Sequence, residues 1–73
     1  MKILIVEDEK PIADLIDMSL TARGYQCTCV YDGAAAADLL VEKRFDLILL
    51  DVMLPGADGF ELLEYIRPLN MPV

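Results

Sequence analysis

Histidine is absent from this sequence of 73 residues, and cysteine occurs only twice. A zinc-type site needs four ligands drawn mainly from these two residue types, so the composition excludes one. Cys27 and Cys29 stand two positions apart in a segment with strand character, which sends both side chains to the same face and prevents an ordinary disulfide between them. We therefore expect both to be reduced core residues.

Basic residues are scarce as well: six stand against thirteen acidic ones, for a net charge of −7 and a pI near 4.2. That balance has the wrong sign for holding a phosphate backbone, so direct contact with nucleic acid is not expected. Uncharged runs such as residues 47–50 are far shorter than the roughly 20 apolar residues that span a bilayer. Because the N-terminus has no signal-peptide pattern, we expect a cytoplasmic protein.

Three segments have strand character, namely residues 2–6, 25–30 and 47–50. The first and third are continuous apolar runs, a pattern typical of parallel strands that are covered on both faces. Each of these two runs ends abruptly in acids, at Glu7 and Asp8 after the first and at Asp51 after the third.

Three helices are predicted between and after these strands. The first begins near Pro11 and ends at Arg23 and Gly24, where the glycine is free to take the left-handed cap. Its predicted buried face consists of Ile12, Leu15, Ile16, Ser19 and Leu20.

The second helix is capped by Asp32, has a narrow apolar stripe at Ala36, Ala37 and Leu40, and is followed by the cations Lys43 and Arg44. The third runs from a cap at Asp58 to about Ile66, and residues 71–73 are the approach to a fourth strand.

The alternation of strands and helices predicts an α/β fold with a parallel sheet and helices on both faces. In such sheets the functional crevice lies beyond the carboxyl ends of the strands, where Glu7, Asp8 and Asp51 are expected. If the first and third strands are neighbours, about 4.8 Å apart, each pair of these carboxylates repels by roughly 3 kcal/mol at an effective dielectric near 20. A hard divalent cation relieves this repulsion, and an all-oxygen site with room for water and a phosphoryl oxygen fits Mg²⁺. The plainer alternative is that acids simply favour the start of a helix.

Three stretches of this sequence resemble the receiver domain of bacterial two-component response regulators: ILIVEDE at 3–9, YDG at 31–33 and DLILLDVMLPGADGFE at 46–61. The resemblance implies a truncated flavodoxin-like sheet with strands in the order 2-1-3, the first part of a five-stranded 2-1-3-4-5 sheet. Residues 1–73 would be the N-terminal portion of a single receiver domain, with three strand-helix units and the start of a fourth strand.

The same resemblance assigns roles at the acidic rim. Asp51 would accept a phosphoryl group from a sensor histidine kinase, and Asp8 would bind Mg²⁺ directly. Glu7 would act on the metal largely through a water, and the backbone carbonyl of Met53 would complete the protein ligands. The sequence of residues 46–61 is similar to the corresponding segment of receivers that are joined to DNA-binding output domains. This resemblance implies that the parent protein is a transcription regulator.

The family also uses a Ser or Thr after its fourth strand and a Lys after its fifth, but no Ser or Thr follows Thr28 and no Lys follows Lys43. One alternative is therefore a truncated or engineered half-domain that assembles without phosphotransfer, and a weaker one is a magnesium-dependent phosphatase. Because the third strand would be left as an open edge, we expect a homo-oligomer formed through that edge or by exchange of residues 71–73.

Overall fold

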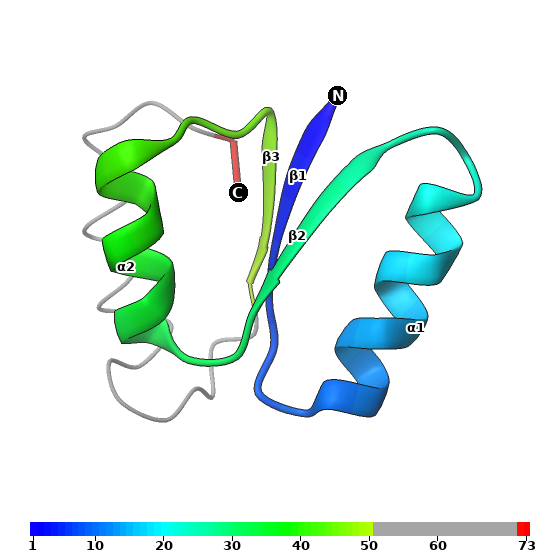
Figure 1. The fold of residues 1–73 in the computed structure, drawn as a ribbon, viewed down its shortest axis with the longest axis horizontal. Helices are drawn as coiled ribbons and strands as arrows, with labels where there is room; N and C mark the ends of the chain where they lie inside the picture. Colours follow the sequence, from blue (N-terminus) through cyan, green and yellow to red (C-terminus); the bar gives the residue numbers. More distant parts are fainter. Residues whose placement is uncertain (51–71) are drawn as a thin grey trace.

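A computed structural model of the chain describes residues 1–50 and 72–73. Its elements are β1 (Lys2–Val6), α1 (Lys10–Thr21), β2 (Gln26–Val30), α2 (Gly33–Glu42) and β3 (Leu47–Leu50). The three strands are parallel in the order β2-β1-β3, with α1 over one face of the sheet and α2 over the other (Figure 1). This confirms the predicted α/β architecture and the strand order 2-1-3.

The central strand β1 explains why its sequence is apolar without alternation. It pairs with β2 from Lys2 to Val6 and with β3 from Ile3 to Val6, and it is sandwiched between the two helices. Its residues from Ile3 to Val6 are at most 1% exposed. Each side chain is thus buried whichever face it leaves, as in other parallel sheets.

The core on the α2 side contains Leu4, Val6, Ala36, Leu40, Phe45 and Ile48. The predicted stripe of α2 is therefore confirmed, with Ala37 half-buried at its margin. The predicted cap is also present, because the carboxylate of Asp32 accepts a hydrogen bond of 2.7 Å from the backbone amide of Ala35.

The predicted buried face of α1 is correct at Ile16 and Leu20, which are half-buried, and wrong at its other three positions. Ile12 and Leu15 are 42% and 64% exposed, and Ser19 is exposed, whereas Ala13 is fully buried. The same helical spacing holds for the face that does meet the sheet, which consists of Ala13, Ile16, Asp17 and Leu20. The small side chain of Ala13 lets the helix lie close to β2, and this contact turns Ile12 and Leu15 outward.

The end of α1 and the neighbouring strand follow the sequence more closely. Gly24 has a φ of +92°, which confirms the prediction that this glycine ends α1 in a left-handed backbone conformation. Cys27 and Cys29 are both free thiols, but they are half-buried rather than fully buried, because β2 is an edge strand.

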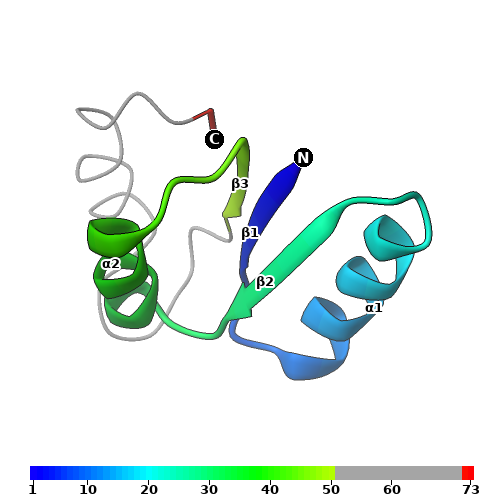
Figure 2. The same cartoon turned by 45° about the horizontal axis from the view of Figure 1, so that its top comes forward.

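The outer edge of β3 has one partner from the end of the chain. The backbone amide of Ile48 donates a hydrogen bond of 2.8 Å to the carbonyl of Pro72. The C-terminal end of the chain lies on the side of β3 away from β1 (Figure 2). The predicted helix 58–66 lies outside the described residues. Neither helix in the described part of the chain is long and apolar enough to cross a membrane.

Candidate functional site

The candidate site lies at the carboxyl end of the sheet, where β1 and β3 finish side by side. Val6, the last residue of β1, is the register partner of Leu50, the last residue of β3. The loops that follow β1 and β2 leave the sheet at this same end (Figure 1). The prediction that the first and third strands are neighbours is confirmed, and with it the basis for expecting the acids after these strands to converge.

Glu7 continues directly from β1 and is held at the rim by its backbone. Its amide donates a hydrogen bond of 3.1 Å to the carbonyl of Val30, which extends the pairing of β1 with β2 by one residue. Its carboxylate accepts a bond of 3.2 Å from the amide of Glu9. Glu7 is half-buried, and it borders an apolar hollow of about 320 Å³ between the strand ends and Ile16 of α1.

Asp8 is exposed in the turn between β1 and α1. The turn is fixed on its far side by Glu9, whose carbonyl accepts bonds of 3.0 Å from the amides of Ile12 and Ala13 at the start of α1. A rigid turn that leaves a carboxylate in solvent beside a strand end is a suitable holder for a hydrated cation.

The carboxylates of Glu7 and Asp8 are the part of the predicted magnesium site that the structure describes; Asp51 and Met53 lie outside the described residues. Within residues 1–50 and 72–73, no group of three His, Cys, Asp or Glu side chains is placed to hold a metal. Hard oxygen donors on adjacent residues fit Mg²⁺ in type, an ion that commonly fills its remaining positions with water or phosphate oxygens.

A contact that sequence reasoning missed ties together the two loops at this end of the sheet. The ammonium of Lys10, at the start of α1, lies 5.4 Å from the centre of the Tyr31 ring, which follows β2. No spacing in the sequence could have revealed it, because the two residues meet only when β1 and β2 pair in parallel.

Residues 3–73 match the family model for the response regulator receiver domain. With the fold and strand order described above, this shows that the chain belongs to the receiver domain family of response regulators.

Solved structures agree with that assignment. The chain is 34% identical to the receiver domain of Francisella response regulator 1452, with a TM-score of 0.89 over 96% of this chain and 58% of that one. It is 32% identical to the response regulator TrrA of Thermotoga maritima, solved in complex with Mg²⁺ and BeF, with a TM-score of 0.88 over 94% of this chain and 60% of that one.

A third solved structure holds the histidine kinase ThkA in complex with TrrA. It matches at 33% identity and a TM-score of 0.85 over 92% of this chain and 58% of that one. The chain thus spans about 58–60% of the length of these relatives. Its family is a signalling family rather than a class of conventional enzymes.

Proposed function

We propose that Asp51 of this protein accepts a phosphoryl group from a sensor histidine kinase with the help of Mg²⁺. The observation that carries the proposal is the pairing of Val6 with Leu50, because each of these residues immediately precedes an acid that the resemblance assigns to the site. TrrA was solved both with Mg²⁺ and BeF and with its kinase, which supports the same chemistry for a relative of similar fold.

In this mechanism a carboxylate oxygen of Asp51 attacks the phosphorus of a phosphohistidine in line with the P–N bond. The O–P bond forms as the P–N bond breaks, and the imidazole leaves with the bonding electron pair. Asp8 would bind the metal directly, Glu7 would bind it through water, and the carbonyl of Met53 would complete the protein ligands. When bound, the ion would neutralise part of the negative charge on the phosphoryl oxygens.

The test is to treat the protein with acetyl phosphate and Mg²⁺ and to look for one added phosphoryl group by intact-protein mass spectrometry. We expect labelling of the wild type, none of Asp51→Asn, and normal labelling of Asp38→Asn, which changes an exposed acid on α2. Labelling of Asp51→Asn at the wild-type level would contradict the proposal.

The second candidate is a half-domain that assembles without phosphotransfer. It predicts a folded protein that stays unlabelled in the experiment above. In either case residues 1–73 would form the N-terminal part of one receiver domain in the cytoplasm, and the parent would carry a DNA-binding output domain.

We further propose that copies of the chain associate through β3 or by exchanging their C-terminal ends. The bond from the Ile48 amide to the Pro72 carbonyl supports exchange, since a partner's copy of the same segment would form the same bond. Light scattering should give a mass above that of one chain at micromolar concentration; a monomer would refute association.

A further inference from the structure

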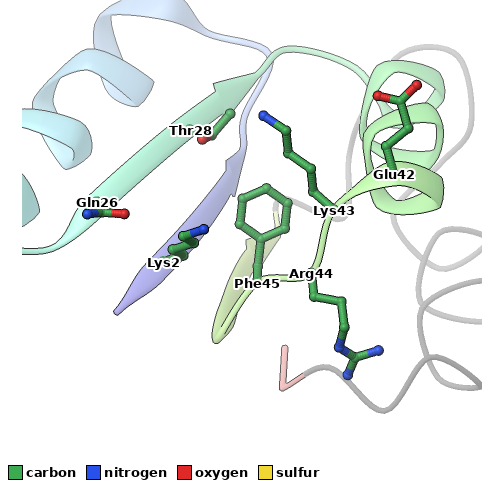
Figure 3. Close-up of a pocket in the computed structure, with 7 residues that line it drawn as sticks. All are labelled: Lys2, Gln26, Thr28, Glu42, Lys43, Arg44 and Phe45. Atoms are coloured by element: carbon green, nitrogen blue, oxygen red, sulfur yellow. The ribbon is translucent and has the colours of Figure 1, made fainter.

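A second concave site lies at the amino end of the sheet, opposite Glu7 and Asp8. It is a pocket of about 490 Å³ at the start of β1 and β2 and at the loop that joins α2 to β3. Its lining residues are Lys2, Gln26, Thr28, Glu42, Lys43, Arg44 and Phe45 (Figure 3). None of the roles proposed above uses this pocket.

The charge of the pocket is the reverse of the charge of the chain. Three of the six basic residues, Lys2, Lys43 and Arg44, line it together with a single acid, although the chain carries thirteen acids. Among the described residues none of these three cations is engaged in a salt bridge. Cations without partners that come from two distant parts of the chain create a local positive potential.

Two features of α2 oppose this potential without cancelling it. The carboxyl end of α2 carries about half a negative charge, and Glu42 adds one more. Together they amount to about one and a half negative charges, which is less than the two ammonium charges of Lys2 and Lys43 even without Arg44. The nearby carboxylate of Asp46 is bound to the backbone amide of Lys2 and does not line the pocket.

Neutral donors complete the lining. Gln26 and Thr28 stand two positions apart on β2, so their side chains leave the same face of the sheet, and both are exposed. Figure 3 shows the side chain of Lys43 extending past the Phe45 ring toward Thr28, while Arg44 points away from that space. Ammonium, hydroxyl and amide groups around one hollow are the donor set that binds phosphate or carboxylate oxygens.

We propose that this pocket binds a compact polyatomic anion that carries phosphate or carboxylate groups. A volume of about 490 Å³ suits an anion with several oxygen atoms rather than a monatomic ion or a flat protein surface. Occupation would link the start of β1 to the end of α2 and would therefore stabilise the fold from the end remote from Asp8.

The experiment is a titration of the ¹⁵N-labelled full chain followed by amide NMR. Divalent ions are first removed on a chelating resin, so that binding at the acidic rim cannot contribute. Pyrophosphate and citrate are the two probes, each added at constant ionic strength. We expect saturable shifts at Gln26, at Thr28 and over residues 43–45. Response to pyrophosphate alone assigns phosphate ligands, response to citrate alone assigns carboxylate ligands, and response to both supports the shared chemistry.

Matched variants separate this pocket from general charge effects. Lys43→Gln and Lys2→Gln should each weaken binding by about tenfold, the value of one charged hydrogen bond. Lys10→Gln removes the same charge at the opposite end of the sheet and should leave binding within about twofold. Equal weakening by all three variants, or no saturable shift with either probe, would overturn the proposal. Asp51→Asn should bind as the wild type does, because the pocket does not depend on the phospho-acceptor role.

Discussion

Asp46 and Lys2 are joined by two hydrogen bonds, although they lie 44 positions apart. The carboxylate of Asp46 accepts a bond of 2.6 Å from the backbone amide of Lys2, and its own amide donates one of 2.8 Å to the carbonyl of Lys2. The side-chain bond satisfies an amide at the start of β1 and sets the position from which β3 begins. Asp46 is thus a register-fixing residue rather than one more surface acid.

Replacing Asp46 by alanine should lower the free energy of unfolding by about 1 kcal/mol, because it removes a charge-assisted bond in an exposed position. Asp46→Asn keeps a neutral hydrogen-bond acceptor and should lower the free energy of unfolding by less. Urea denaturation of the two variants and the wild type measures both effects. An unchanged midpoint for the alanine variant would show that the carboxylate bond does not stabilise the fold.

Asp32→Ala should also cost about 1 kcal/mol, since it leaves the amide of Ala35 at the start of α2 without its cap. Asp32→Ser replaces one good capping residue by another and is the matched control. Thermal unfolding followed by circular dichroism compares them. An equal loss of thermal stability in both variants would mean that Asp32 stabilises the helix through its charge and not through the capping hydrogen bond.

Asp8→Asn should weaken Mg²⁺ binding by more than tenfold, a loss typical even of changes outside the ligand shell. Glu9→Gln is the control, because it neutralises a neighbouring exposed acid and keeps the backbone carbonyl that holds the start of α1. Isothermal titration with MgCl₂ gives both affinities. If the two substitutions weaken Mg²⁺ binding equally, Asp8 is not a direct ligand of the metal.

The thiol of Cys29 gives a pH-dependent prediction. Burial, and next the charge of Asp17, raise the pKa of Cys29 above its ordinary value of 9.0, and the sulfur lies 3.8 Å from an oxygen of Asp17. The folded chain therefore keeps this proton at a pH where the unfolded chain has lost it. The resulting contribution to stability is complete below about pH 9 and is lost as the pH rises through the folded-state pKa.

Asp17→Asn should lower the pKa of Cys29 and shift its alkylation by iodoacetamide to lower pH. Rates are measured in a Cys27→Ser background so that one thiol reacts. Asp38→Asn, on the opposite side of the sheet, is the control. If Asp17→Asn leaves the pH dependence of alkylation unchanged, Asp17 does not contribute to the raised pKa of Cys29.

The outward position of Leu15 can be checked by a pair of substitutions on α1. Leu15→Ala should change the free energy of unfolding by less than about 0.5 kcal/mol, because the side chain is 64% exposed. Ala13→Leu should destabilise by about 1–3 kcal/mol, because it inserts bulk between the helix and β2. If denaturation experiments show a larger loss of stability for Leu15→Ala than for Ala13→Leu, the helix face predicted from the sequence pattern is the one that packs on the sheet.

That helix face shows where reading the sequence succeeds and where it fails. The bounds of β3 and the cap at Asp32 are predicted correctly because they depend on local chemistry: an apolar run ended by an acid, and a carboxylate before a helix. The side of α1 that meets the sheet depends on how closely the helix approaches. Ala13 governs that distance, and an alanine contributes little to a hydrophobic pattern.

The acidic rim and the pocket at the amino end of the sheet differ in how far the sequence predicts them. Glu7, Asp8 and Asp51 can be proposed from the sequence because they end strand-like runs, and parallel strands finish at one edge of a sheet. The positions of Asp51 and Met53 lie outside the described residues, so their roles stay predictions. The pocket lined by Lys2 and Lys43 escapes sequence reasoning, because Lys43 beside Arg44 is equally typical of an ordinary helix end.

The parallel order of the strands also has a consequence for how the chain reaches its native state. Every strand pairing in the described part of the chain joins segments with at least one whole helix between them. Among these described elements no hairpin is available as an early local nucleus, so chain entropy is lost in closing a long loop before their ladder bonds form. We therefore expect folding to begin with transient helices at residues 10–21 and 33–42 that dock onto the apolar β1 segment.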